Sequence, residues 1–348
     1  MYPSIIAPRI RVIASAALAL CLNSAAFSQG CVISRGGGGN MTMHDSGLLD
    51  RGQWQVTTSY RWLYSDRHFS GLEEHEYRQE QNTEVINNSH FLDFTATYAS
   101  TRRLWFNFTV PTVYTDRSSL YEHKGNSSGE RYATQAGGIG DIRVTANYWL
   151  FDTENHRKNN LLLGFGFKAP TGDYKATDIF QRSGGPQERF VDSSIQPGDG
   201  GWGLVFEAQG YHRFTERTTG YATASYLANP REDVDVTGFS VPDSFLYRAG
   251  FDFAAFPNRG ITLSLGARME GVPAEDLWGG SNGRRRPGYA ISIEPGFTYA
   301  RERHALTVSV PVAVQRNRTQ SIPEIPRGRH GDAAFADYTV NASYSYRF

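Results

Sequence analysis

The sequence predicts an all-β fold, a transmembrane antiparallel up-and-down β-barrel of about twelve strands, within a range of about ten to fourteen. Three observations carry this prediction. Segments of roughly ten to fourteen residues alternate apolar and polar side chains, and no long segment shows the 3.6-residue period of a helix. Short and long connections alternate along the chain. The chain also ends on Phe348, which closes a run of alternating aromatic residues.

The composition fits a sheet with one apolar and one wetted face. The 348 residues include 35 basic and 35 acidic side chains, so the formal net charge is zero. A non-specific nucleic-acid binder needs a strong basic surface, so nucleic acid is not an expected partner. Aromatic residues make up 13% of the chain, yet the mean hydropathy is −0.47. This combination is unusual for a soluble enzyme.

The first 28 residues are predicted to be a signal peptide. Arg9 and Arg11 precede an apolar run over 12–22, which leads into small residues, and we expect cleavage after Ser28 or Ala26. The apolar run is too short to span a bilayer, and no later stretch approaches eighteen uninterrupted apolar residues. The sequence therefore predicts export without a transmembrane helix.

Residues 29–51 are expected to form a flexible amino-terminal segment. Its four consecutive glycines, within 34–40, precede neither a Lys-Ser/Thr pair nor a helix, which excludes a phosphate-binding loop. Cys21 lies in the signal peptide, so only Cys31 remains and no internal disulfide forms. Cys31 is either a lipid acceptor or a bystander thiol; the Leu usual three places before a lipid-acceptor Cys is missing.

The barrel is expected over 52–348. The predicted strands are 54–64, 90–100, 104–115, 141–151, 161–171, 202–213, 220–228, 245–256, 261–271, 289–300, 305–315 and 334–348. Most have one apolar face, as in Leu104, Phe106 and Phe108. Their length matches a tilted strand that crosses about 30 Å of hydrocarbon. A further strand pair over 67–85 would raise the count by two.

Aromatic residues near strand ends are predicted to lie at the headgroup level of the membrane, where such rings are enriched. They are Trp54, Trp105, Tyr148, Trp149, Trp202 and Tyr299.

The connections distinguish a barrel from a soluble sandwich. Short connections lie near Arg102, at 257–260 and at 301–303, and six longer, polar linkers rich in Gly, Ser, Asp, Arg and Pro alternate with the tighter ones. Outer-membrane barrels show this asymmetry between periplasmic turns and extracellular loops. A sandwich would have shorter strands, near five or six residues. The sequence therefore predicts location in the cell outer membrane.

The last strand carries a predicted barrel-insertion signal in Tyr344, Tyr346 and Phe348. In lipid no backbone group can stay unpaired, so the sheet must close and the last strand must pair with the first. The barrel-assembly machinery is accordingly an expected partner, together with outer-membrane lipid and lipopolysaccharide.

Two stretches give a family resemblance. The stretch 138–141 (GIGD) opens one expected strand and 168–173 (KAPTGD) closes the next, and the strand start at 200–202 (GGW) fits as well. With these motifs the chain resembles the MetA-pathway of phenol degradation proteins, a family of predicted outer-membrane barrels. The resemblance covers roughly 52–348. It implies uptake of small compounds, including aromatic or hydrophobic ones, but transfers no substrate residues.

The faces opposite the apolar ones are expected to line the lumen. Either their charges pair into a salt-bridged filling, because an unpaired buried charge is costly, or they form a constriction that sorts solutes. A twelve-stranded barrel predicts a narrow, partly obstructed pore, with the amino-terminal segment or the 171–200 loop as candidate plugs. The candidate lumen-lining residues are Asp141, Arg143, Lys168, Glu207, Gln209, Arg248, Asp252, Arg268, Glu270 and Glu294.

Catalysis is not predicted, and neither a cofactor nor a metal is expected. The sequence lacks a Gly-x-Ser-x-Gly turn and a His-Glu-x-x-His motif, and its nine histidines are scattered. The acidic positions within 232–235 would either bind calcium in a loop or stay solvated. The basic run 284–286 would either meet lipopolysaccharide phosphates or form an ordinary exposed patch.

These observations predict a channel or transporter for small solutes, working by passive or gated diffusion through a narrow charged lumen. The alternative is a barrel that does not transport and acts as a structural or partner-binding protein through its extracellular loops. Uptake of purely hydrophobic compounds would need an apolar pocket, whereas the predicted lumen is charged. Substrate identity, direction of transport and oligomeric state stay open at this point.

Overall fold

The computed structural model describes residues 29–30, 48–124, 129–234 and 238–348. The predicted signal peptide, Cys31 and the glycine run within 34–40 lie outside these residues, as does most of the amino-terminal segment. None of the helices in the described ranges has the length and apolar character needed to cross a membrane.

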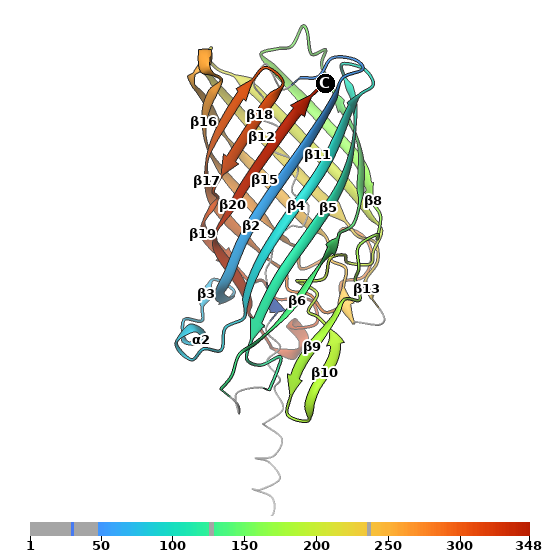
Figure 1. Cartoon of the computed structure of the whole chain (residues 1–348), viewed down its shortest axis with the longest axis vertical. Coiled ribbons are helices and arrows are strands. Elements are labelled where there is room, and N and C mark those ends of the chain that lie inside the picture. The colour runs from blue at the N-terminus through green and yellow to red at the C-terminus, as the bar shows by residue number, and fades with distance from the viewer. Residues whose placement is uncertain (1–28, 31–47, 125–128, 235–237) are drawn as a thin grey trace, which may run out of the picture.

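The described chain forms one antiparallel barrel whose wall it crosses twelve times (Figure 1). Two of these crossings are interrupted and consist of two strands each. The wall consists of β2 (Trp54–Ser70), β4 (Ile86–Ala99), β5 (Leu104–Ser119), β6 (Tyr132–Ile139) with β7 (Arg143–Trp149), β8 (Asn159–Lys168), β11 (Gly203–Arg213), β12 (Thr218–Ala228), β15 (Ser244–Phe256), β16 (Ile261–Val272), β17 (Gly288–Arg301), β18 (His304–Ser309) with β19 (Val312–Asn317), and β20 (Ala333–Arg347).

The remaining elements are short and do not cross the barrel wall, although β1 pairs with β20 and β3 with β2. They are β1 (Gln29–Gly30), β3 (Glu73–Glu74), α2 (Tyr77–Glu80), β9 (Thr177–Arg182), β10 (Gly185–Phe190), β13 (Asp233–Val234), β14 (Phe239–Ser240), and the 3-10 turns Pro257–Arg259 and Ile325–Arg327. The extra strand pair considered over 67–85 is not formed. Instead β2 continues to Ser70, and β3 and α2 follow it, so the predicted count of twelve is confirmed.

The barrel closes between its first and last strands. β2 pairs with β20 from Gln55 opposite Arg347 to Phe69 opposite Ala333. Beyond that register, Trp54 and Phe348 exchange two backbone hydrogen bonds of 3.0 Å. Phe348 therefore completes the seam, which explains why the alternating pattern runs to the final residue. In Figure 1 the two strands lie side by side at the front of the barrel.

The surface of the barrel is inverted relative to a soluble protein. Phe165, Phe251 and Leu265 are 45%, 57% and 59% exposed, whereas Lys168, Asp252 and Arg268, at alternate positions on the same three strands, are buried. Apolar rings on an outer surface are stable when acyl chains solvate them, and a closed barrel leaves no unpaired edge in the lipid. The predicted location in the outer membrane is therefore confirmed by the fold.

The two ends of the barrel differ. Tight turns and the carboxyl terminus gather at one end, and α2, β3 and the hairpin β9–β10 project from the other (Figure 1). In outer-membrane barrels short turns face the periplasm and long loops face the exterior. We name the two ends periplasmic and extracellular accordingly.

One interrupted crossing shapes the lumen. β5 pairs first with β7 and then with β6, and residues 140–142 separate the two strands. Of the two strands of this crossing, β8 pairs with β7 and not with β6, from Leu162 opposite Trp149 to Lys168 opposite Arg143. Beyond Lys168, toward the extracellular end, the chain leaves the wall and enters the long connection 169–202.

Two of the aromatic residues predicted to lie at the headgroup level point into the barrel instead. Trp105 and Trp149 are 1% and 0% exposed and pack on each other inside the barrel, with ring centroids 5.7 Å apart. Their placement at the headgroup level was wrong, because position 105 alternates with the outward-facing Leu104 and Phe106. Trp54, Tyr148, Trp202 and Tyr299 are exposed, as expected.

Candidate functional site

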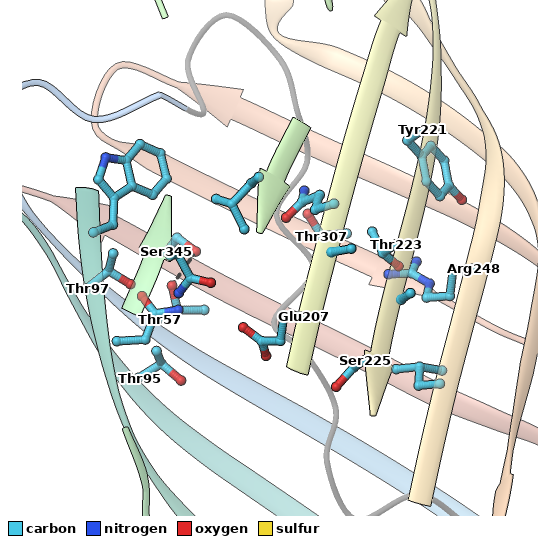
Figure 2. Close-up of a pocket in the computed structure, with 18 of the residues that line it drawn as sticks. Thr57, Thr95, Thr97, Glu207, Tyr221, Thr223, Ser225, Arg248, Thr307 and Ser345 are labelled. Atoms are coloured by element: carbon cyan, nitrogen blue, oxygen red, sulfur yellow. Dashed lines mark hydrogen bonds between the residues drawn. The ribbon is translucent and has the colours of Figure 1, made fainter. Parts of the chain in front are cut away.

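The periplasmic half of the barrel contains a polar cavity with a volume of about 130 Å³. Its lining comes from strands all around the wall: Thr57 on β2, Thr97 on β4, Glu207 on β11 and Thr223 on β12. Figure 2 shows the Glu207 carboxylate in the middle of the lining, with the hydroxyls of Thr57 and Thr97 on one side and Ser225 on the other. The cavity therefore belongs to the lumen rather than to a surface crevice.

An ion-pair network covers one side of the wall. Arg248 binds Glu294 through two hydrogen bonds of 2.8 and 3.0 Å, and Ser309 donates a third of 2.8 Å to the same carboxylate. Arg268 lies 3.0 Å from Glu270, which Arg61 approaches to 3.3 Å. Arg268 and Glu270 lie on the same strand, β16, whereas the other two pairs join strands that are not neighbours in the sheet. The charges are therefore paired, as the salt-bridged reading of the lumen expects, but not across neighbouring strands.

A second group of charges lies further toward the extracellular end, around a smaller cavity of about 50 Å³. Arg143 lies 3.1 Å from Asp93. Lys168 lies 3.8 Å from Asp141 and also forms a close ion pair with Asp199. Here too the basic groups are neutralised by carboxylates of other segments.

Two lumen carboxylates differ from the rest. Glu207 and Asp252 line the larger cavity, and neither makes an ion pair or hydrogen bond with another described residue. Gln209 lines the same cavity. Seven of the ten candidate residues form ion pairs, and the other three, Gln209, Glu207 and Asp252, line the larger cavity.

The two family-like stretches bind each other. Asp141 accepts the amide N–H groups of Gly172 and Asp199, each at 3.0 Å. Thr171 donates its hydroxyl to the Gly140 carbonyl at 3.0 Å and accepts the amide of Ile142 at 2.9 Å. The Gly-Asp and Pro-Thr-Gly-Asp motifs therefore fix the point where the chain leaves β8, and they hold a third segment, near Asp199, against the wall.

That third segment lies inside the extracellular half. Val191 and Ile195 are fully buried and pack with Ala136 of β6, and Pro197 lines the smaller cavity. The approach is close: a Cβ atom on Gly198 would lie 2.5 Å from the Gly172 carbonyl oxygen. Part of the 171–200 loop therefore occupies lumen space.

Ion pairs connect this segment with two other extracellular segments. Asp192 accepts hydrogen bonds of 3.1 and 2.7 Å from Arg286 in the β16–β17 loop, and Arg117 at the end of β5 lies 3.8 Å away. Arg117 also binds Glu122 at 2.6 Å. Burial alone would raise the pKa of Asp192, but the guanidinium groups of Arg117 and Arg286 hold it well below its usual range. We call Asp192, Arg286, Arg117 and Glu122 the mouth cluster.

Two of the three residues in the basic run 284–286 are buried. Burial lowers the pKa of Arg286 to about 9, although Asp192 opposes that shift. Arg285 is buried too, and binds Asp276 through two contacts of 2.5 Å. These two guanidinium groups are therefore committed to internal carboxylates, whereas Arg284 stays exposed.

An apolar cluster lies at the periplasmic end of the lumen. Leu49 is 2% exposed and packs with Trp105, Trp149, Leu162 and Tyr211. This cluster was not predicted, although the alternation along β5 and β7 turns Trp105 and Trp149 inward. Leu49 precedes the first strand and has no comparable signal.

The histidines and acidic loops bear on two kinds of site, metal-binding groups and the Ser89–His90 pair. No group of three or more His, Cys, Asp or Glu side chains there has metal-binding geometry. Ser89 binds Thr115 at 3.0 Å inside the barrel, whereas the adjacent His90 binds the hydroxyl of Tyr60 at 2.7 Å. Glu232 accepts the amide of Asn282 at 2.9 Å, and position 235 lies outside the described residues.

Comparison with known proteins supports the fold. The chain aligns with the COG4313 outer membrane channel from Pseudomonas putida F1 at a TM-score of 0.58 and 14% identity, covering 87% of this chain and 98% of the other. The toluene transporter TodX of P. putida aligns at 0.41 and 12%, covering 87% and 91%. A FadL homologue of Pseudomonas aeruginosa aligns at 0.41 and 10%, covering 88% and 92%. Of these three, the first identifies the fold.

The sequence comparisons are more limited. No functionally curated protein matches the chain. A family model described as "Putative MetA-pathway of phenol degradation" matches residues 77–185, which include both motif stretches. The protein is therefore an outer-membrane β-barrel with the fold of that channel, and its resemblance to the MetA-pathway of phenol degradation family is confirmed over residues 77–185.

Proposed function

We propose that this protein is an outer-membrane channel that lets small solutes cross the membrane by diffusion through its lumen. The observation that carries the proposal is the cavity, which is lined by polar side chains from strands on all sides of a closed barrel. Polar and charged groups that line a lumen are the groups that sort solutes in channels. The structural likeness to an outer membrane channel agrees with this function.

The solutes include compounds with an aromatic or otherwise apolar body. The description of the matching family refers to phenol degradation. The cavity lining also contains the aromatic and apolar residues Trp105, Leu162, Tyr221 and Leu246 beside its polar groups. Apolar and aromatic walls with a few polar groups are typical of sites that bind small organic molecules. Most of the lining residues carry hydroxyl, amide or charged groups, which suit the polar part of such a compound.

A barrel that does not transport is the second candidate. It is favoured by the mouth cluster and by the buried segment 191–201, which fill the extracellular half. In our proposal these features make the passage gated rather than sealed. The two functions differ in whether solutes pass at all.

The test is solute entry into liposomes that contain the purified barrel. Sugars, amino acids and phenolic compounds bearing a charged or sugar group are compared, because lipid alone excludes all of them. Thr223→Trp should slow entry at least several-fold, since Thr223 faces the cavity. Ala222→Trp is the matched control, because Ala222 is the adjacent residue on the outer face. Equal entry with and without protein would refute the channel.

The biogenesis steps belong to the same proposal. Residues 1–28 are removed on export, 29–51 form an amino-terminal segment, and 52–348 insert as the barrel. Tyr344, Tyr346 and Phe348 lie on one face of the last strand region, as an insertion signal read by the assembly machinery requires. Outer-membrane lipid and lipopolysaccharide surround the barrel, and the chain is not an enzyme.

A further inference from the structure

The basic side chains of the mid-barrel inner wall are all committed to carboxylates. Among the described residues, Arg61, Arg143, Lys168, Arg248 and Arg268 each lie within ion-pair distance of an Asp or Glu, at 3.3, 3.1, 3.8, 2.8 and 3.0 Å. A solute anion that enters the lumen therefore meets guanidinium and ammonium groups that already have counter-charges.

The acidic side chains are not all committed. Glu207 and Asp252 face the larger cavity and make no ion pair or hydrogen bond with other described residues, although Asp252 is only 7% exposed. Glu207 feels the positive charge of Arg143, and Asp252 feels that of Arg248. Both guanidinium groups already form ion pairs, Arg143 with Asp93 and Arg248 with Glu294. Among the residues that the structure describes, the uncompensated charge of the cavity is therefore negative.

The two carboxylates lie at different depths. Glu207 is opposite Ser225, which is opposite Leu246, and Asp252 lies six positions further along β15 toward the periplasm. At about 3.3 Å per residue this corresponds to roughly 20 Å along the strand. The two acids thus form successive sites along the passage rather than one chelating pair. Arg213 and Arg347 lie beyond them, past the last cavity residues of β11 and β20.

A partly buried carboxylate without a counter-charge is costly, and an entering cation supplies what is missing. The neighbouring lining adds apolar contact, because Trp105, Leu162 and Leu246 present carbon surface. Charged lumen residues are the groups that set selectivity in barrels and channels.

We propose that the lumen favours small organic cations with an apolar body over anions of similar size, with Glu207 and Asp252 as successive cation sites. The inference rests on the proposed channel function and names its substrate class.

The test is the zero-current potential of a planar bilayer across a tenfold gradient of phenyltrimethylammonium benzenesulfonate at pH 8. Both ions carry a phenyl ring and a permanent charge, so size and titration do not distinguish them. The wild type should pass the cation roughly tenfold better, which corresponds to about 1.4 kcal/mol. Glu207→Gln and Asp252→Asn should each lower the ratio several-fold, whereas Glu207→Asp should keep most of it. Glu216→Gln removes the same charge from an exposed turn and should leave the ratio unchanged.

The outcomes separate the two proposals. A ratio of one or less, or a ratio that neither Glu207→Gln nor Asp252→Asn alters, overturns the cation preference while the channel stands. A folded wild-type barrel that carries no current even in potassium chloride refutes the channel, and the cation preference with it. Heat-modifiable migration of each variant on gels confirms that the barrel has folded.

Discussion

Replacing Asp192 with Asn should release the extracellular segment that lies in the lumen. Asp192 receives two hydrogen bonds from Arg286, and both side chains are 7% exposed. The substitution keeps the shape of the side chain but removes its charge. Arg286 then loses its carboxylate, and Arg117 retains Glu122 alone among the acids of the mouth cluster.

The magnitude follows from the burial of the pair. Removing one partner of a buried ion pair typically costs about 3–5 kcal/mol, because it leaves an uncompensated charge. Asn can still accept one hydrogen bond, so we expect the lower end, about 3 kcal/mol. Since 1.4 kcal/mol is a factor of ten, the ratio of released to held segment should rise about a hundredfold.

Limited proteolysis measures this ratio directly. Trypsin sites at Lys175, Arg182 and Arg189 lie in the 169–202 connection, and cleavage tracks the open population when opening is fast. The Asp192→Asn barrel should be cut in this connection far faster than the wild type, and its conductance should rise. Glu324→Gln is the matched control, because Glu324 binds Arg318 in a bidentate pair within the β19–β20 loop alone.

The control variant should lose thermal stability without faster cleavage in the 169–202 connection. Identical cleavage rates for wild type and Asp192→Asn would refute the reasoning, as would equal acceleration by both substitutions. The first result would mean that the mouth cluster does not hold the segment. The second would mean that any loop damage exposes it.

Three further outcomes are expected. Gly198→Ala should dislodge the same segment, because its Cβ would lie 2.5 Å from a backbone oxygen, whereas Gly184→Ala, with open space around it, should not; trypsin cleavage compares the two. Leu49→Ala should cost roughly 2–4 kcal/mol of packing at the periplasmic end and raise single-channel conductance; an unchanged conductance would show that the cluster does not restrict the pore. Burial alone would raise the pKa of Asp332, but its hydrogen bond to His68 and nearby positive charge lower that pKa to about 2. A depressed carboxylate pKa stabilises the fold above about pH 4, and this contribution of about 2 kcal/mol is lost as the pH falls toward 2. Melting temperatures at pH 5, 3 and 2 should therefore fall more steeply for the wild type than for Asp332→Asn, and parallel curves would contradict the assignment.

Local patterns carried most of the fold. The twelve crossings follow from period-two alternation, which depends only on neighbouring residues, and from the alternation of connection lengths. The pairing of Phe348 was also predictable, because every backbone group in lipid must be paired and the last strand must therefore pair with the first. The prediction for Trp105 and Trp149 was wrong because it rested on residue type. Their positions in the alternating pattern of the strand, which decide the side that each side chain faces, place both inside the barrel.

Long-range contacts set the limit of prediction. The inner faces of the strands identified the candidate lumen residues, but which charges pair and which do not depends on strand neighbours and loops. Asp192 and Arg286 are 94 positions apart, and nothing local marks either as buried. The motifs around Gly140 and Thr171 were recognised as a family feature, whereas their mutual hydrogen bonds became visible only in three dimensions.

The most direct test of the channel is current through single barrels in planar bilayers with potassium chloride on both sides. We expect discrete openings from the wild type, smaller or absent steps from Thr223→Trp, and wild-type steps from Ala222→Trp. Repeated insertion of folded, heat-modifiable barrels that carry no current would contradict the account, and would make the protein a closed barrel whose polar interior only fills its wall.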